Sequence, residues 1–286
     1  MNSSKQLKRR LALAALAVAA VLLSVTTATF AWYIFNTSAR TTEVKMSAGS
    51  SVSLQIASKK DYDEKGEAAF GSATQMEPME NGLIAVSTDR IANGFQAVTG
   101  FRGEWQEDAY RSIARYFQKA KDRKEYYKTT LLLRTTAQSL DVYLAGIGST
   151  DREGQHLSTA MRLGLVAGGQ EFIFELNKAR NPNRIGDNGS EKAEGYYVLD
   201  STRTDGTVVP FTPLDEDALC SYDPATGAAS RKDNSVKICT LTGPGGQYCD
   251  PVSVDVYLWL EGCDEDCTVD LAGQTMELVS LIFAGT

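Results

Sequence analysis

Histidine is nearly absent from this sequence, in which His156 is the single one among 286 residues. Metal sites that need two histidines from one chain, the HExxH zinc site among them, are therefore excluded. A Ser-His-Asp site is numerically possible, but His156 stands in a stretch of Gly, Gln and Ser that is typical of a turn. The Gly243–Gly246 segment lacks the spacing and the lysine of a phosphate-binding loop. We predict no catalytic residue and no cofactor.

Basic residues are scarce outside the N-terminus. The chain carries a net charge of −7, and the part after Arg10 carries −11 because four basic residues precede the first acidic one. An acidic body of this kind argues against nucleic acid as a partner. Disorder along the whole chain is excluded, since 43% hydrophobic and 23% charged residues are ordinary values for a globular protein.

One uncharged run dominates the N-terminus. Residues 1–10 are basic, and Leu11–Phe35 contains no charge, which is long enough to cross a bilayer as one helix. The basic residues predict a cytoplasmic N-terminus and an exported domain at residues 40–286. A buried helix of a soluble protein is the alternative, but the charge asymmetry and the length argue against it.

The same run also fits a signal peptide. Its apolar core then shortens to Leu11–Val25, and Thr29-Phe30-Ala31 forms a small-x-small site with cleavage between Ala31 and Trp32. We expect either a membrane protein with an extracellular C-terminal domain, anchored through residues 11–35, or a protein that is secreted after cleavage.

The cysteines are few and clustered in the last quarter of the chain. They are Cys220, Cys239, Cys249, Cys263 and Cys267. Export permits disulfides, and the odd number leaves at least one thiol free or available to another molecule. Cys263 and Cys267 can close one small loop and the other three can supply a second bridge, with the connectivity left open. A zinc cluster is the alternative, against which the absence of CxxC pairs argues.

A period of two dominates the exported part. Val252–Leu260 alternates apolar and polar residues most clearly, and Thr42–Ala48 and Ser51–Ile56 repeat the pattern. Further strands are expected at residues 129–134, 140–147, 161–166, 171–176 and 275–283. Many short strands separated by turn residues predict a mainly β protein, an antiparallel β-sandwich. Arg134 lies within one of these apolar strands and Arg162 beside another, so each is expected to pair with an acidic group or to stand at an edge.

Three segments interrupt this pattern. Trp105–Ala120 has apolar residues at helical spacing, which predicts one amphipathic helix flanking the sandwich; contact with a membrane or nucleic acid is the alternative. Residues near 177–194 and 215–234 are rich in Asn, Gly, Asp and Ser and predict long surface loops.

The segment after the clearest strand is strongly acidic. Glu261, Asp264, Asp266 and Asp270 are candidate calcium ligands, because calcium accepts six to eight oxygens in a flexible geometry. The spacing does not match an EF-hand, since no Gly occupies the sixth position. An acidic connection pinned by a disulfide is the simpler interpretation.

The order of these pieces resembles a known group of proteins. The basic N-terminus, the apolar run ending in Ala28–Tyr33 and the strand after it are similar to the precursors of camelysin and TasA-type biofilm-matrix fibre proteins of Gram-positive bacteria. Three further blocks resemble recurring segments of uncharacterised exported proteins of that broad group: Leu131–Thr136 with Leu140–Leu144, Ala160–Gly164 and Val256–Cys267. The resemblance implies a jelly-roll-like fold, removal of the leader by a dedicated signal peptidase, and fibres or homo-oligomers formed by strand exchange, for which Thr42–Ala48 is the segment available. The metallopeptidase label of camelysin does not transfer, because no HExxH exists.

These observations favour an exported, non-enzymatic cell-surface or matrix structural protein. Two alternatives come from other classes: a surface metallopeptidase-like or other hydrolase, and a solute- or glycan-binding surface module. An enzyme predicts a deep pocket with converging polar groups. A glycan binder predicts exposed aromatic faces, for which the candidates are Trp105, Trp259 and the Tyr126-Tyr127 and Tyr196-Tyr197 pairs.

Overall fold

The computed structural model of this chain describes residues 42–47, 54–76, 83–98, 118–119, 125–184, 196–203 and 207–286. The expected leader and its cleavage site lie outside these residues. Within the described ranges, no helix combines the length and the apolar character that a membrane span requires.

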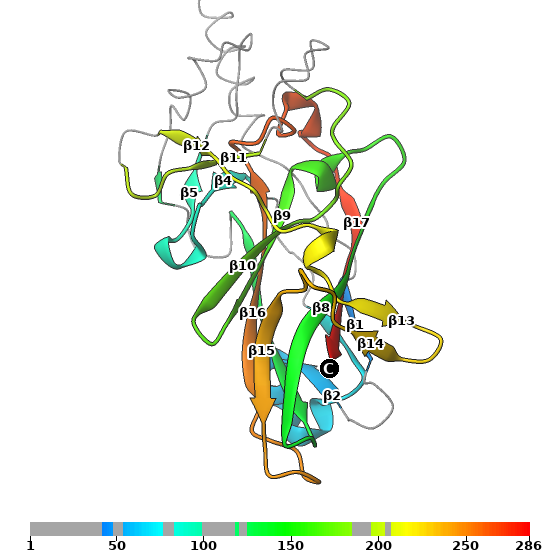
Figure 1. The fold of residues 1–286 in the computed structure, drawn as a ribbon. Helices are drawn as coiled ribbons and strands as arrows, with labels where there is room; N and C mark the ends of the chain where they lie inside the picture. Colours follow the sequence, from blue (N-terminus) through cyan, green and yellow to red (C-terminus); the bar gives the residue numbers. More distant parts are fainter. Residues whose placement is uncertain are drawn as a thin grey trace, which may run out of the picture.

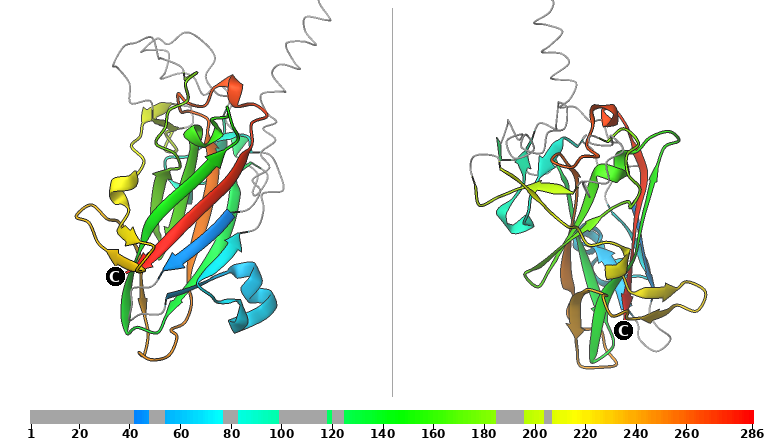
Figure 2. Two further views of the ribbon diagram at one scale, coloured as in Figure 1. Left: turned by 90° about the vertical axis from the view of Figure 1, so that its right-hand side faces the viewer. Right: turned by 45° about the horizontal axis from the view of Figure 1, so that its top comes forward.

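Five strands form one sheet in the order β15-β8-β17-β1-β3 (Figure 1). Their bounds are β15 Lys237–Thr242, β8 Ser139–Asp151, β17 Met276–Gly285, β1 Thr42–Ser47 and β3 Ala73–Met76. Neighbours are antiparallel except β1 and β17, which run parallel with Val44 opposite Leu281. Figure 2 shows β1 beside β17 in this layer. The first strand after the expected leader is therefore an interior strand of its own chain.

Eight strands form a second sheet around the long strand β16. β16 pairs with β9 along one edge and with β7, then β4, along the other; β4 alone is parallel to it. The order continues outward to β10 on one side, and to β2 beyond β7 or to β5 and β6 beyond β4 on the other. The bounds are β10 Gln170–Glu175, β9 Met161–Ala167, β16 Val252–Glu261, β7 Tyr127–Thr135, β2 Leu54–Ser58, β4 Ala85–Ser87, β5 Gln96–Ala97 and β6 Gln118–Lys119.

Two short hairpins and several helical turns complete the described structure. They are β11 Tyr197–Leu199 with β12 Val208–Pro210, β13 Ser221–Asp223 with β14 Ala228–Ser230, the α-helix α2 Lys59–Lys65, and the 3-10 helices η1 Gly66–Ala69, η2 Ile91–Asn93, η4 Leu157–Ala160, η5 Glu216–Ala218 and η6 Val269–Leu271. The Ser58 side chain accepts a hydrogen bond from the backbone N–H of Asp61, which caps α2 at its N-terminus.

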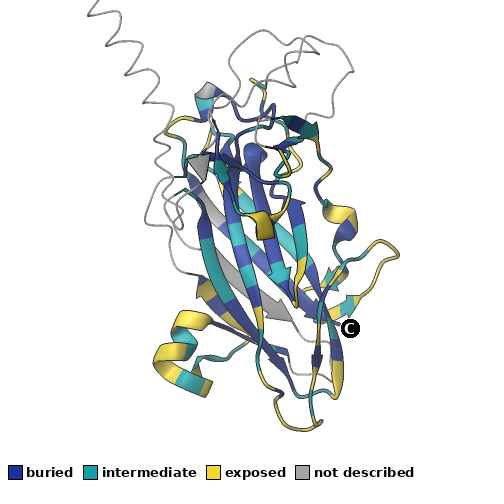
Figure 3. Ribbon diagram, turned by 90° about the vertical axis from the view of Figure 1, so that its left-hand side faces the viewer, coloured by how far each residue is buried: buried dark blue, intermediate teal, exposed yellow. Residues whose placement is uncertain are grey.

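The main hydrophobic core contains side chains from both large sheets. β16 contributes the row Val254, Val256, Leu258 and Leu260, all at most 1% exposed. This is the row that the alternation in the sequence predicts to face a core. Exposed residues instead gather on α2 and on the connections between strands (Figure 3).

A second apolar cluster covers the opposite face of β16. Trp259 is fully buried there and packs with Phe95, whose ring centroid lies 5.1 Å from that of Trp259 and 4.2 Å from that of Tyr126. Gly164 of β9 makes room for this packing, because a Cβ at this position would lie 2.5 Å from Cδ1 of Ile91. β16 is therefore covered on both faces.

The structure confirms a mainly β chain with mostly antiparallel pairing. The strands expected from period two correspond to β1, β2, β7 to β10, β16 and β17. The helix expected at 105–120 lies outside the described residues except for Gln118 and Lys119, which form β6. α2 was not expected. The loop expected near 215–234 contains the β13–β14 hairpin.

Candidate functional site: a buried ionic cluster and a groove at a sheet edge

The acidic segment that follows β16 is buried. Glu261, Asp264, Glu265 and Asp266 are between 0 and 2% exposed. Carboxylates are rarely buried in proteins unless cations or hydrogen-bond donors satisfy them. The partners of this segment come from β9 and from the residues after β10, and the residue before β11 contacts the arginines among these partners. Together these residues form a buried ionic cluster.

Arg162 of β9 is the most deeply buried cation of the cluster. Its side chain is 2% exposed, lies opposite Trp259 in the β9–β16 register, and donates to Oδ2 of Asp264. A second guanidinium N–H donates to the carbonyl oxygen of Met161 over 2.9 Å. Burial lowers the pKa of Arg162, and the nearby Glu261 carboxylate opposes this shift. The Arg162–Asp264 pair attaches the acidic segment to the sheet.

The residues after β10 hold Asp266. The backbone N–H of Asn181 donates to Oδ1 of Asp266 over 3.0 Å, and its side-chain amide donates to the Asp266 carbonyl oxygen over 3.0 Å. Nε of Arg180 lies 3.1 Å from Oδ2 of Asp266, although the angle is too poor for a hydrogen bond. Burial raises the pKa of Asp266, and Arg180 opposes the shift. Asp266 is thus held mainly by Asn181, with charge compensation from Arg180.

Tyr196 packs against the two arginines of the ionic cluster. Its hydroxyl donates to Oε2 of Glu175 over 2.5 Å, and the guanidinium carbons of Arg180 and Arg162 lie 4.5 and 5.1 Å from its ring centroid. Burial raises the pKa of Tyr196, and the hydrogen bond to Glu175 raises it further. The ring therefore lies against both cations, a contact that adds cation–π attraction.

Glu261 is a fully buried carboxyl group in the same cluster. It accepts hydrogen bonds from Nε1 of Trp259 over 3.0 Å and from the backbone N–H of Cys263 over 3.2 Å. Burial raises its pKa to about 7, although the hydrogen bonds and Arg162 act in the opposite direction. Glu261 therefore changes charge near neutral pH, well above the range of an ordinary carboxyl group.

The calcium candidates do not converge on one point. Asp264 is bound by Arg162, Asp266 by Asn181, and Asp270 accepts from Thr268 and from Nδ2 of Asn183. In the part of the chain that the structure describes, no group of three or more acidic, His or Cys side chains is arranged to hold a metal ion. The structure assigns these carboxylates to guanidinium and amide donors.

The five cysteines all lie among the described residues and none is joined to another. The expected bridges are therefore not formed in this structure. Cys220, Cys249 and Cys267 are buried, while Cys239 and Cys263 are partly exposed. Burial raises the pKa of the Cys239 thiol to about 11 and the pKa values of Cys263 and Cys267 as well. Thiols in such apolar surroundings react slowly.

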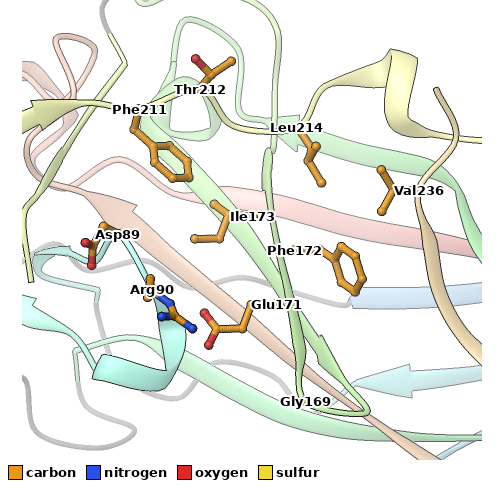
Figure 4. Close-up of a pocket in the computed structure, with 10 residues that line it drawn as sticks. All are labelled: Asp89, Arg90, Gly169, Glu171, Phe172, Ile173, Phe211, Thr212, Leu214 and Val236. Carbon is orange, nitrogen blue, oxygen red and sulfur yellow. The ribbon is translucent and has the colours of Figure 1, made fainter.

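A groove of about 470 Å³ lies along the outer edge of β10. Its apolar lining comes from β10 and from two crossing segments, and its polar lining includes residues that precede η2. Figure 4 shows these side chains, which are Asp89, Arg90, Gly169, Glu171, Phe172, Ile173, Phe211, Thr212, Leu214 and Val236. The groove is separate from the residues that bind the acidic segment.

The aromatic residues considered for glycan binding are mostly covered. Trp259 is fully buried and Tyr126 and Tyr127 are 8% exposed, while Tyr196 lies against the two arginines. Trp105 falls outside the described residues. A sugar-binding platform needs accessible ring faces. Trp259, Tyr126 and Tyr127 do not supply one, while Tyr196 and Tyr197 are partly exposed.

Arg134 and His156 have structural surroundings. Arg134 donates to Gln55 and Glu67, and its guanidinium carbon lies 3.9 Å from the ring centroid of Phe70. A charged residue in an apolar strand requires such pairing, as the sequence indicated. The backbone N–H of His156 donates to Oε1 of Gln274 over 2.6 Å, immediately before η4. Neither residue belongs to the ionic cluster or the groove.

Sequence reasoning identified Arg162 and the acidic segment but not their mutual contact. It missed Arg180 and Asn181, which lie in a segment whose composition is typical of a surface loop, and it considered Tyr196 only as a candidate for glycan binding. Comparisons with protein-family models, curated proteins and solved structures found no match for this chain.

Proposed function

We propose that this chain is an exported, non-enzymatic structural protein of the cell surface or extracellular matrix, similar to the camelysin and TasA-type proteins. The proposal includes a jelly-roll-like sandwich behind an N-terminal leader. It is supported by the uncharged run Leu11–Phe35 after a basic N-terminus, and by the mainly β fold of the described residues.

The position of β1 carries the assembly part of the proposal. β1 begins seven residues after the apolar run ends, and it lies between β17 and β3 with backbone pairing on both sides. A strand of this kind can pair in the same way with the sheet of another copy, because the backbone hydrogen bonds are the same within one copy and between two copies. Withdrawing it would leave the edges of β17 and β3 open.

Strand lending is testable by mixing two single-substitution chains. Glu43 is the register partner of Ser280, so Glu43→Cys in one chain and Ser280→Cys in another are held side by side when β1 of one copy pairs with β17 of the other, which favours a disulfide between them. We expect mixed disulfide-linked dimers on non-reducing gels after the two chains are unfolded and refolded together.

Ser253→Cys is the matched control for random collision, because Ser253 is exposed on β16 in the other sheet. Mixed dimers with Ser280→Cys should exceed those with Ser253→Cys by at least about fivefold. Equal yields would show that β1 stays within its own chain and would remove strand lending from the proposal.

The leader has an independent test. Mass spectrometry of the native N-terminus separates the two forms, because a chain that begins at Trp32 is the product of cleavage after Ala31 and an intact N-terminus is membrane-anchored. Either form supports export. Recovery of the intact chain from the cytosolic soluble fraction would contradict it.

The alternatives draw less support from the described residues. A hydrolase needs a nucleophile beside a base in an accessible pocket, whereas the polar groups of the ionic cluster are buried against each other. A glycan-binding module lacks accessible rings at Trp259, Tyr126 and Tyr127. A binding role of another kind remains for the groove along β10.

A further inference from the structure

Part of the outer edge of β10 has no paired strand among the described residues. Leu214 donates its backbone N–H to the carbonyl oxygen of Ile173 over 2.8 Å and accepts from the N–H of Glu175 over 3.0 Å. The backbone groups of Ile173 and Glu175 therefore point away from β9, toward the outer edge. Such groups alternate between the two edges of an antiparallel strand. The N–H and C=O of Glu171 and the N–H of Ile173 therefore also face outward, and no described residue gives them a backbone partner on that side.

The groove contains side chains from both faces of this edge. Phe172 points to one side, where Leu214 and Val236 lie, and Ile173 points to the other side, toward Phe211 (Figure 4). All five are apolar, and the four other than Ile173 are only partly buried. A strand added along β10 would place successive side chains alternately on these two sides. The groove therefore offers one apolar wall to the side chains on each side of the added strand.

One polar atom in the lining lacks a donor. Oδ1 of Asp89 is buried and makes no hydrogen bond in the described structure. The neighbouring carboxylate of Glu171 accepts from the backbone N–H of Ala92 over 3.1 Å and is already engaged. A buried carboxylate oxygen without a donor is unfavourable, so an occupant with a basic side chain at this point gains both a hydrogen bond and an ion pair.

We propose that this groove binds an extended peptide of another protein, which adds a short strand to β10. The peptide carries apolar side chains at alternating positions toward Phe172 and Ile173, and a lysine or arginine toward Asp89. Its backbone pairs with Glu171 and Ile173. This mode of recognition takes affinity from the backbone ladder and specificity from the alternating side chains.

The position of Leu214 argues against a second copy of β10 as the occupant of the groove. It already occupies the edge position opposite Phe174, and in a symmetric pair the same residue of each copy would block the other. Only a few residues around Glu171 could then pair, which is too short for a stable interface. A peptide of another protein can instead turn away from β10 at the position where Leu214 pairs with it.

The test uses the full chain and a fluorescein-labelled probe, acetyl-Val-Ile-Val-Lys-Val-amide. This probe places Ile and Lys on one face and the three valines on the other. We expect saturable binding by fluorescence anisotropy, and slower hydrogen exchange at the amides of Glu171 and Ile173 when the probe is bound. The matched probe with N-methylated backbone amides cannot donate to a strand and should bind at least about tenfold more weakly.

Asp89→Asn tests the polar contact, and Asp63→Asn on the exposed helix α2 is its matched control. Asp89→Asn should weaken the lysine probe about fivefold or more and leave a norleucine-for-lysine probe unchanged, while Asp63→Asn should affect neither. Equal binding of the methylated probe, unchanged exchange at β10, or no binding at millimolar probe would each overturn the proposal. None of these results bears on export or on the exchange of β1.

Discussion

Arg162 shows how one buried charge organises its surroundings. Its guanidinium is fully inside the protein, yet Asp264 and the carbonyl of Met161 accept its hydrogen bonds, and the ring of Tyr196 lies near it. Removing one member of a buried ion pair leaves an uncompensated charge, which is far more costly than losing an exposed pair. The acidic segment after β16 is therefore fixed by chemistry that its own composition does not reveal.

Glu261 makes stability depend on pH. Its pKa is about 7 in the folded chain and near the ordinary 4.5 when unfolded. Between these values the unfolded chain has released a proton that the folded chain retains, so the free energy of unfolding falls as pH rises, by up to about 1.4 kcal/mol per pH unit. Glu261→Gln imitates the protonated form and should flatten this dependence.

Urea unfolding at pH 5 and pH 8 measures the effect. The loss of stability between the two pH values should be smaller in Glu261→Gln than in the unaltered chain by about 2 kcal/mol. Glu216→Gln, at an exposed carboxylate paired with Lys178, should leave the pH dependence unchanged. Parallel pH profiles for Glu261→Gln and the unaltered chain would show that Glu261 does not titrate in this range.

At the residue scale, the sequence predicted that Arg134 and Arg162 would need partners, because an arginine in an apolar strand cannot remain unpaired. It did not predict which partners. Asp264 is 102 residues from Arg162 along the chain, and Glu67 is 67 residues from Arg134. Only the pairing of distant strands brings these groups together.

At the scale of elements, β16 is the best-predicted part of the chain. Its alternation placed Val254, Val256, Leu258 and Leu260 on one face, and that face is buried in the main core. The opposite face, which carries Trp259, is buried as well. The pattern gave no sign of this second cover, because it comes from separate segments that contribute Ile91, Phe95 and Tyr126.

Close packing over Gly164 allows a direct test of that second cover. A Cβ at Gly164 would lie 2.5 Å from Cδ1 of Ile91 and 3.0 Å from Cζ3 of Trp259. We expect Gly164→Ala to lower the free energy of unfolding by about 1 to 3 kcal/mol, the usual cost of overpacking. Chemical denaturation followed by tryptophan fluorescence measures it.

Gly71→Ala is the control for this change. A Cβ at Gly71 would have its nearest neighbour at an ordinary 3.5 Å, so this variant should differ little from the unaltered chain. If both variants unfolded at the same denaturant concentration, the packing of Trp259 and Ile91 over β9 would be looser than the structure has it.

Most of the elements that sequence reasoning missed are short or lack an apolar face. β15 is the exception, because it has six residues and buries Ile238 and Leu241. β4, β5 and β6 have two or three residues each, which is too few to establish a period. α2 buries none of its residues, so it shows no helical spacing of apolar positions. Its signal was local, the Ser58 cap followed by Asp61 and Lys65.

At the scale of the whole molecule, the state of the cysteines in the structure differs from the state that export would favour. The five thiols are unbridged in the structure, whereas export would expose them to an oxidising environment. We expect alkylation of the denatured, unreduced chain to add five groups by mass spectrometry. Three or one added groups would reveal one or two disulfides, in which case Cys263 and Cys267 are the first pair to map by proteolysis.

The sequence by itself determined the mainly β character, the positions of the long strands and the need to pair Arg134 and Arg162, because periodicity and charge are local properties that a chain carries before it folds. Tertiary structure decided the rest. It placed β1 between β17 and β3, buried the acidic segment against Arg162 and Asn181, and gave the outward backbone groups of Glu171 no partner among the described residues. These features depend on contacts between segments that are distant along the chain. Such contacts form only when the complete fold pairs its strands and buries its charged groups.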